Sequence, residues 1–532
     1  MKPSKKWVII GTLLYFFTLS SLILGCFYLI WSIYLNVYPL FVSKLTTKLI
    51  LQILLNFISL FFETFGIFYT TLLFYHMANS CFHPQLNTLE TQEYEKKELP
   101  EVTVVVPVHN PIIDVLKETL VALKKMDYPK SKVKVIIGDD TLNEELAFKT
   151  KSLADEYNAI YFFSPLNKHF KAGMLNEILQ TVETEYIFFL DYDHTIFPTV
   201  LEKCVLMLEK DDRIAYVQTK VNFREVKSKL QLWESVMYAQ FFEIFGRSKS
   251  IRKTTIFNGS SACFRTKILK EIGGIPRYSF TEDVATTVEI LEKRYKGVLL
   301  DEYGSLGLVP AKFDVLISQI IRWAKGQFTV LSKKWREILR SDLSFFDKID
   351  LLFSISLFLV ASVLYFSGFI YITMFFSNIS LIRPPIQDFL PLLIIPVSFS
   401  LSYYLSGILS ISFANRSNMN YKYRDLIFFY IFALVFNPFT IYATFKSLIS
   451  NKEPIRGKDK WNERVPIYSY LVFVTIVGGI MVACSVLDFI NNSFGGSFWL
   501  GLGILGSSML VTTPLTIYFM GKTKKNNIYE IN

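Results

Sequence analysis

The stretch Tyr186-Ile-Phe-Phe-Leu-Asp-Tyr-Asp193 is an apolar run of five residues followed by two acidic residues on either side of a tyrosine. Its length and its aromatic and β-branched content are typical of a strand buried on both faces of a sheet. Similar runs precede it at Val102-Thr-Val-Val-Val-Pro107 and Lys132-Val-Lys-Val-Ile-Ile-Gly138, and residues 112–126 between them have the pattern of an amphipathic helix. Strands that alternate with helices predict an α/β domain with a parallel sheet and helices on both faces.

Polar residues follow each of these strands. They are His109-Asn110, Asp139-Asp140 and Asp191-Tyr192-Asp193. Asp is also common in turns after strands, so an Asp-x-Asp pair is weak by itself. However, ligands of open α/β sheets bind beyond the carboxyl ends of the strands. Two carboxylates at that edge supply the oxygen ligands that Mg²⁺ or Mn²⁺ prefers, and they leave coordination positions for diphosphate oxygens. The pattern predicts a divalent cation at Asp191 and Asp193, with Asp140 near a base or ribose.

Two further acidic residues open a predicted helix. Glu282 and Asp283 precede a helix that we expect from Val284 to Lys293, with Thr281 at the capping position. Such a sequence is a favourable helix N-terminus even without a chemical role. A carboxylate at a helix N-terminus is stabilised as an anion, so Asp283 can act as a general base under either interpretation.

The composition indicates a membrane protein. The chain has 532 residues, a net charge of +10, 51% hydrophobic residues and only 19% charged residues, which excludes an intrinsically disordered protein. A spanning helix needs about 20 apolar residues. Seven long apolar runs are present, at 8–35, 49–77, 351–376, 389–414, 426–445, 467–487 and 497–520. They flank a polar middle region.

Basic residues near the ends of these runs predict the orientation, because cytoplasmic loops carry an excess of Lys and Arg. Lys2, Lys5 and Lys6 place the N-terminus in the cytoplasm, and Lys522, Lys524 and Lys525 do the same for the C-terminus. Basic residues flank 426–445 on both sides, which favours an interfacial or re-entrant segment broken at Asn437-Pro438. We therefore expect a multi-pass protein of the cell membrane with six spans and one interfacial segment.

The predicted organisation has five parts. They are two transmembrane helices (1–77), a cytosolic domain with interfacial helices (78–350), two transmembrane helices (351–414), the interfacial segment with a basic cytosolic loop (415–466), and two transmembrane helices with a cytosolic tail (467–532). Residues 230–246 and 313–339 are amphipathic and are expected to hold the domain against the bilayer. Glu63 lies near the middle of the second span, where a charge is costly. One interpretation is that Glu63 lines a water-filled pore. The other is that it is protonated or paired with a residue of another helix.

The order and spacing of six motifs resemble the family-2 membrane glycosyltransferases, a group that includes the cellulose, chitin, mannan and hyaluronan synthases. The motifs are Asp139-Asp140, Lys171-Ala-Gly-Met-Leu-Asn176, Asp191-x-Asp193, Phe257-Asn-Gly-Ser260, Thr281-Glu-Asp283 and Gln319-Ile-Ile-Arg-Trp323. The resemblance covers residues 100–330. It implies a GT-A (Rossmann-like) fold inserted between transmembrane helices, an inverting mechanism, a divalent cation (Mg²⁺ or Mn²⁺) and a nucleotide-diphosphate sugar as donor.

The resemblance also implies roles for single residues. Asp283 would be the base, and Asp191 and Asp193 would hold the metal. Donor-binding residues would be Pro107, His109, Asp139, Asp140, Lys171, Asp191 and Asp193, and residues that bind the acceptor or the diphosphate would be Glu282, Gln319, Arg322 and Trp323. The chain departs from the family pattern at His109 and Asn110-Pro111, and at Asn167-Lys168, where an arginine upstream of Lys171 is absent. The basic residues 456–464 resemble the loop that closes over the donor in the polysaccharide synthases.

The resemblance therefore predicts an enzyme that extends a β-linked polysaccharide and extrudes it across the membrane. The alternative is a non-processive glycosyltransferase that acts on a membrane lipid such as a polyprenyl phosphate or a glycolipid. A transporter or receptor with a regulatory domain would leave the ordered acids unexplained. The expected partners are the nucleotide-diphosphate sugar, a glycan or lipid acceptor and membrane lipids, but no nucleic acid. The sequence does not identify the donor sugar or partner subunits.

Overall fold

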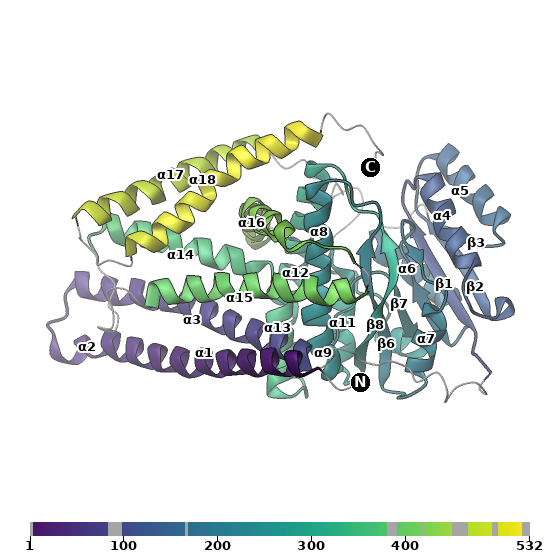
Figure 1. The fold of residues 1–532 in the computed structure, drawn as a ribbon, viewed down its shortest axis with the longest axis horizontal. Coiled ribbons are helices and arrows are strands. Elements are labelled where there is room, and N and C mark those ends of the chain that lie inside the picture. The colour runs from purple at the N-terminus through teal and green to yellow at the C-terminus, as the bar shows by residue number, and fades with distance from the viewer. Residues whose placement is uncertain are drawn as a thin grey trace.

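The computed structural model describes residues 4–82, 98–164, 169–379, 391–417, 419–449, 467–491 and 498–523. An α/β domain lies at one end of the molecule, and long apolar helices lie at the other (Figure 1). In the chain the domain is inserted between two sets of these helices. The predicted fold class, an α/β domain inserted between apolar helices, is confirmed.

The domain is built on a mixed sheet with the strand order β3-β2-β1-β4-β7-β6-β8-β5. The first four strands in this order are parallel, whereas β7 runs antiparallel to its neighbours β4 and β6. The three predicted strands correspond to β1, β2 and β4. The bounds are β1 Val102–Val108, β2 Val133–Asp139, β3 Ile160–Phe163, β4 Tyr186–Phe189, β5 Thr195–Ile196, β6 Ile214–Phe223, β7 Ala262–Arg265 and β8 Lys296–Gly307.

Helices cover both faces of this sheet, and the predicted helix at 112–126 corresponds to α4. The helices of the domain are α4 Ile113–Lys124, η2 Lys130–Lys132, α5 Glu144–Glu156, α6 Phe170–Thr181, α7 Val200–Leu208, α8 Lys229–Gln240, the π-helical turn η3 Phe241–Gly246, α9 Arg247–Ile251, α10 Thr266–Glu271, α11 Glu282–Glu292 and α12 Phe313–Arg340. The amphipathic stretches predicted at 230–246 and 313–339 form α8 with η3, and α12.

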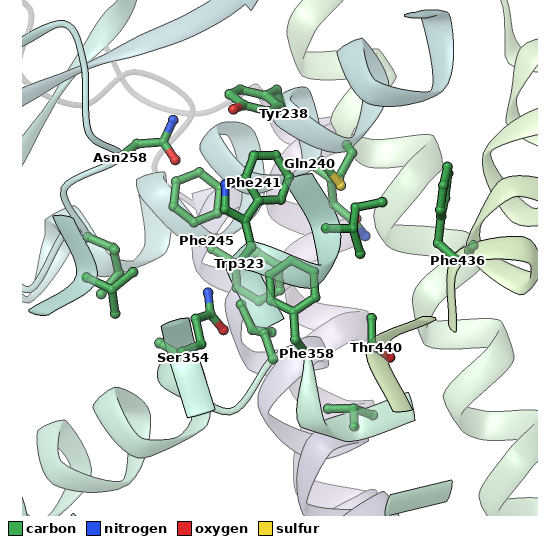
Figure 2. A pocket seen from close by; sticks show the side chains of 18 of the residues that line it. Tyr238, Gln240, Phe241, Phe245, Asn258, Trp323, Ser354, Phe358, Phe436 and Thr440 are labelled. Carbon is green, nitrogen blue, oxygen red and sulfur yellow. The ribbon is translucent and has the colours of Figure 1, made fainter. Parts of the chain in front are cut away.

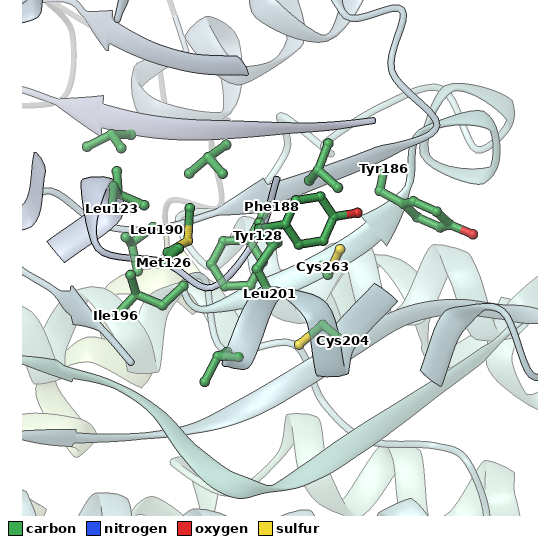
Figure 3. Packing of buried hydrophobic residues seen from close by; sticks show 14 of the residues in the cluster. Leu123, Met126, Tyr128, Tyr186, Phe188, Leu190, Ile196, Leu201, Cys204 and Cys263 are labelled. Atoms are coloured by element: carbon green, nitrogen blue, oxygen red, sulfur yellow. The ribbon is translucent and has the colours of Figure 1, made fainter. Parts of the chain in front are cut away.

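Strand β4 shows why a short apolar run forms the centre of the domain. Successive side chains of a strand point to opposite faces of a sheet. Phe188 and Leu190 pack on one face with Leu201 and Cys204 of α7 (Figure 3), whereas Phe189 belongs to a second core cluster on the other face. Both faces are buried, so the end of the strand, where Asp191 follows, is held in a fixed position.

The remaining helices form the apolar part of the molecule. They are α1 Lys5–Val37, α2 Pro39–Val42, α3 Thr47–Phe82, α13 Phe345–Ile355, α14 Leu359–Phe376, α15 Pro391–Ala414, η4 Asn415–Ser417, η5 Tyr423–Asp425, α16 Leu426–Ile449, α17 Ile467–Asn491 and α18 Phe498–Thr523. Among the described residues, five segments are long and apolar enough to cross a membrane: Lys5–Val42, Thr47–Phe82, Tyr423–Ile449, Ile467–Ile490 and Gly503–Met520.

Two predicted segments differ in detail from the structure. The run 351–376 is divided, because α13 ends at Ile355 and the apolar helix α14 begins only at Leu359. Asp350, just before this run, has its carboxylate buried against His76 and Lys249, so the start of the run lies at the polar junction with the domain. Pro438, expected to break its segment, lies inside the continuous helix α16. Apolar side chains of the surrounding helices pack closely on α16.

The orientation of α16 bears on its predicted interfacial position. Figure 1 shows α16 nearly end-on, whereas α1, α3 and α15 run across the view. Helix α16 therefore lies crosswise to these helices, although its length and composition would also suit a membrane span. In the same figure α1 begins and α18 ends on the side of the α/β domain, as both termini are predicted to do. The basic residues 456–464 and Lys2, Lys524 and Lys525 lie outside the described residues.

A buried cluster of charges joins the domain to the apolar helices. Lys220 of β6 lies 2.9 Å from Glu243 and 3.0 Å from Asp301, and Arg247 lies 2.8 Å from Glu243 and 3.1 Å from Asp301. The guanidinium of Arg247 also stacks on the ring of Phe413 in α15, 4.7 Å from its centroid. Each buried charge has an opposite charge beside it, so this junction is costly to separate.

Glu63 is paired within the apolar helices. Its carboxylate accepts hydrogen bonds from Tyr28 Oη of α1 at 2.5 Å and from Ser59 Oγ at 2.8 Å. It is not among the residues that line the cavity described below. Of the two alternatives, the structure favours pairing with another helix.

Candidate active site

Polar residues at the ends of β1 and β2 form the first part of the site. Asp139 is completely buried, and its oxygens accept hydrogen bonds from the backbone N–H of Thr141 at 2.8 Å and from Tyr161 Oη at 2.9 Å. Asp140 Oδ1 lies 2.7 Å from Nδ1 of the half-exposed His109, and Pro107 is buried in β1. Asp139 and Pro107 therefore shape this edge, while the half-exposed His109 faces solvent with the buried Asp140 behind it.

The end of β4 carries a group that suits a metal ion. Ligand atoms of Asp191, Asp193 and His194 all lie within 4.8 Å of one another. Two carboxylates and one imidazole are a donor set that Mg²⁺ or Mn²⁺ accepts, so the residues fit the implied cation. Burial raises the pKa of Asp193. Burial acts in the same sense on Asp191, but the charges of Lys171 and His194 outweigh it and hold the pKa of Asp191 below its ordinary value.

Lys171 connects this group to the turn that precedes β7. Its Nζ lies 2.7 Å from Asp191 Oδ1 and donates to the carbonyl oxygen of Gly259 at 2.9 Å. Gly259 has a φ of +83°, and a Cβ added there would lie 3.1 Å from Asp283 Oδ2. Glycine is therefore required at this position both by the backbone and by the nearness of Asp283.

Asp283 lies at the start of α11. Its Oδ1 accepts the backbone N–H of Val284 at 2.8 Å. The expectation that the helix N-terminus stabilises the Asp283 anion is wrong in its net effect, because burial and the neighbouring charge of Glu282 outweigh it and raise the pKa of Asp283 to about 7. Thr281 occupies the capping position as expected, but its side chain does not cap the helix and instead lies 3.1 Å from Ser279 Oγ. A carboxylate that titrates near neutral pH is suited to general-base catalysis.

A cavity of about 460 Å³ leads from Asp283 into the apolar helices. Its inner end is lined by Asn258, Asp283 and Trp323, and its far end by residues of α3, α15 and α16, among them Asn437 and Thr440. Figure 2 shows Trp323 among the rings of Phe241, Phe245 and Phe358. The volume lies within the range of about 300–1,000 Å³ that is usual for ligand pockets.

The structure separates the members of the Gln319 to Trp323 motif. Trp323 lines the cavity, and the positive charge of Arg322 lowers the pKa of Asp191. Gln319 is half-buried on α12 and is not among the cavity residues, and neither is Glu282. Asn167 and Lys168 lie outside the described residues.

Sequence reasoning missed three residues near this site. His194 follows the acidic pair directly, and its position next to two carboxylates was the available signal. Tyr238 lines the cavity, and Glu234 lies one helical turn before it on α8. Glu234 is fully buried, and neither of its carboxylate oxygens forms a hydrogen bond with a described residue. Burial, together with the charge of Asp193, raises the pKa of Glu234 to about 8. An acid among the apolar residues of an amphipathic helix could have indicated it.

Comparisons with known proteins find a family match and several similar proteins. Residues 103–273 match the family described as Glycosyl transferase family 2. The cellulose synthase catalytic subunit (UDP-forming) of Pseudomonas fluorescens strain SBW25 is 30% identical over 237 residues, which are 44% of this chain and 32% of that protein. The cellulose synthase 1 catalytic subunit (UDP-forming) of Komagataeibacter xylinus is 28% identical over 239 residues, 44% of this chain and 31% of that protein.

Among solved structures, a mannosyltransferase from Pyrobaculum calidifontis in complex with GDP-mannose and Mn²⁺ is similar at 17% identity and a TM-score of 0.43. It covers 68% of this chain, and the whole of that chain is matched. The similarity to the two cellulose synthase subunits spans about a third of their length.

Proposed function

The chain carries a glycosyltransferase family 2 domain, and we propose that it is a membrane-embedded inverting enzyme that extends a β-linked polysaccharide. The donor would be a nucleotide-diphosphate sugar bound at the carboxyl ends of β1, β2 and β4. The observation that carries the proposal is a cavity that has Asp283 at its inner end and the apolar helices at its far end. An acceptor in this cavity would have its end at the catalytic base and its length directed towards the membrane.

Each group of the site has a chemical task in this reaction. An acceptor hydroxyl must attack the anomeric carbon opposite the departing diphosphate, and Asp283 would take its proton as the bond forms. Asp191, Asp193 and His194 would hold the divalent cation, which neutralises charge on the departing diphosphate when bound. His109 and Asp140 would bind the nucleoside. Trp323 would stack on the sugar at the end of the acceptor.

The lining of the cavity supports a glycan. Aromatic rings such as Trp233, Trp323 and Phe436 line the cavity together with polar groups such as Gln327 and Ser354. Flat rings pack on the apolar faces of sugars, and the polar groups can bond with hydroxyls. The predicted orientation, with the α/β domain and both termini in the cytoplasm, would then direct the product across the membrane.

A lipid acceptor is the second candidate. Much of the cavity wall is apolar, including Leu73, Phe241, Ile320 and Val360, and several of these residues belong to helices of the apolar region. A lipid tail would suit this wall, with only the head group at Asp283. A transporter or receptor role has no comparable support, because it gives no task to the acids at the strand ends.

Product sizing distinguishes the two candidates. The purified protein in lipid nanodiscs is incubated with Mn²⁺ and a panel of radiolabelled nucleotide sugars, and the products are separated by solvent extraction and gel filtration. We expect long, water-soluble or insoluble glycan chains. Label that is found only in a lipid extract, with one sugar per lipid, would replace the polymer proposal with the lipid one. Absence of both transfer and donor hydrolysis with every donor would refute both.

A further inference from the structure

Lys171 lies where a cation would have to bind. Its ammonium group is 2.7 Å from Oδ1 of Asp191, a residue of the candidate metal group, and 2.9 Å from the carbonyl oxygen of Gly259. The side chain of Lys171 retains 22% exposure and that of Asp191 35%, so both are accessible from solvent. The carboxylate of Asp191 would therefore have to bind two positive groups, Lys171 and the proposed divalent cation.

The two positive groups compete for this carboxylate. A divalent cation on Asp191 and an ammonium on the same carboxylate repel each other at short range in a half-buried site. Asp193 has no such resident partner at hydrogen-bond distance, because the nearest basic group among the described residues is His194 at 3.9 Å. The competition is therefore confined to Asp191.

A donor diphosphate changes this balance, because its oxygens offer the ammonium another anionic partner. Lysine carries its charge on a flexible four-carbon stem and can exchange partners without moving the backbone. The backbone of Lys171 belongs to α6, which packs on the sheet through Met174 and Ile178. Only the side chain has to move.

We propose that Lys171 is a resident counter-ion of Asp191 that competes with the cation and is released to the donor diphosphate, so that cation and donor bind cooperatively. The inference rests on the proposed metal-dependent transfer. Its consequence is an enzyme that binds the cation weakly without donor and strongly with it. Coupling between two ligands is reciprocal, so the donor must also bind better with the cation, by a factor of about 5–150 in typical cases.

The test measures Mn²⁺ binding by electron paramagnetic resonance on the full-length protein in nanodiscs. Wild type, Lys171→Met and Lys171→Arg are titrated with Mn²⁺ alone and then with saturating UDP or GDP, whichever gives the larger response in wild type. Lys203→Met is the matched control. Lys203 is 26% exposed and forms a similar ion pair with Glu302, at 2.5 Å, so the control removes the same charge from a pair outside the site.

We expect Lys171→Met to bind Mn²⁺ alone at least about 5-fold more tightly than wild type and to lose most of the enhancement by nucleotide. Lys171→Arg and Lys203→Met should keep the wild-type pattern. An unchanged or weaker Mn²⁺ affinity in Lys171→Met, or an undiminished nucleotide enhancement, would overturn the inference while leaving the proposed function intact. If wild type binds no Mn²⁺ yet transfers sugar, the metal proposal and this inference both fail.

Discussion

Replacing Asp283 by Asn tests the proposed base most directly. The amide keeps an oxygen that can accept the backbone N–H of Val284, which lies 2.8 Å from Oδ1 in the wild type, so α11 should fold unchanged. The substitution removes only the proton acceptor. General-base catalysis contributes about 10²–10⁴-fold to a rate, so we expect Asp283→Asn to lose transfer by at least this factor and to retain donor and Mn²⁺ binding.

The pH dependence follows from the environment of the same carboxylate. Burial and the charge of Glu282 raise the pKa of Asp283 to about 7. The base must be ionised, so the rate should rise with pH along an acidic limb that reports the ionisation of Asp283. Glu282→Gln removes the like charge and lowers the pKa of Asp283, which should shift the acidic limb to lower pH.

The assay is the release of nucleoside diphosphate by protein in nanodiscs, measured across this pH range at one saturating Mn²⁺ concentration. The cation also lowers the pKa of Asp283, so the difference between wild type and Glu282→Gln is compared, not the absolute midpoint. Melting temperatures confirm that the variants are folded. If Asp283→Asn remained near wild type while Glu282→Gln was inactive, Glu282 would be the base. If both remained active, Thr281-Glu-Asp283 would be only a helix N-terminus.

Three further predictions concern other parts of the molecule. Asp193→Ala should abolish both transfer and Mn²⁺ binding without lowering the melting temperature, because this side chain at a strand end supports no core; full activity in a chelator would contradict the metal site. Glu234→Gln should be more stable than wild type at high pH. The pKa of Glu234 is raised from 4.5 to about 8, so the folded state holds a proton that the unfolded state loses, and wild-type stability falls as pH rises between these values. The measurement is the melting temperature of each protein as a function of pH. If the melting temperatures of the two proteins change in parallel between these pH values, Glu234 is not buried as a protonated acid. Cysteines introduced at Ser417 and Asn451 should be labelled from the same side, since basic residues flank α16; labelling from opposite sides would show that α16 spans the membrane.

Local patterns were sufficient for much of the α/β domain. The strands β1, β2 and β4, the helix α4 and the start of α11 all lie close to their predicted positions. Each depends on the periodicity of apolar residues within one short segment and on the polar residues at its end. The candidate metal pair was predictable for the same reason, because Asp191 and Asp193 are neighbours in the chain and follow a strand that is buried on both faces.

Segments in the apolar region were less predictable from local patterns. The run 351–376 has a uniform composition, but it is divided into α13 and α14, and Asp350 just before it is held by Lys249 and His76, which are distant in the chain. Pro438 was expected to interrupt its helix, and α16 nevertheless continues through it because helices on several sides hold it in place. In both cases the contacts at these positions come from other elements.

The amino-acid sequence alone was enough to indicate an α/β domain between apolar helices, the acids at its strand ends and the motif order of a glycosyltransferase. The contact of Lys171 with Asp191, the closeness of Gly259 to Asp283 and the burial of Glu234 came from the folded structure. So did the cavity from Asp283 to α16. The physical reason is range: strand and helix patterns arise from residues a few positions apart, whereas ion pairs, raised pKa values and cavities depend on how distant segments pack.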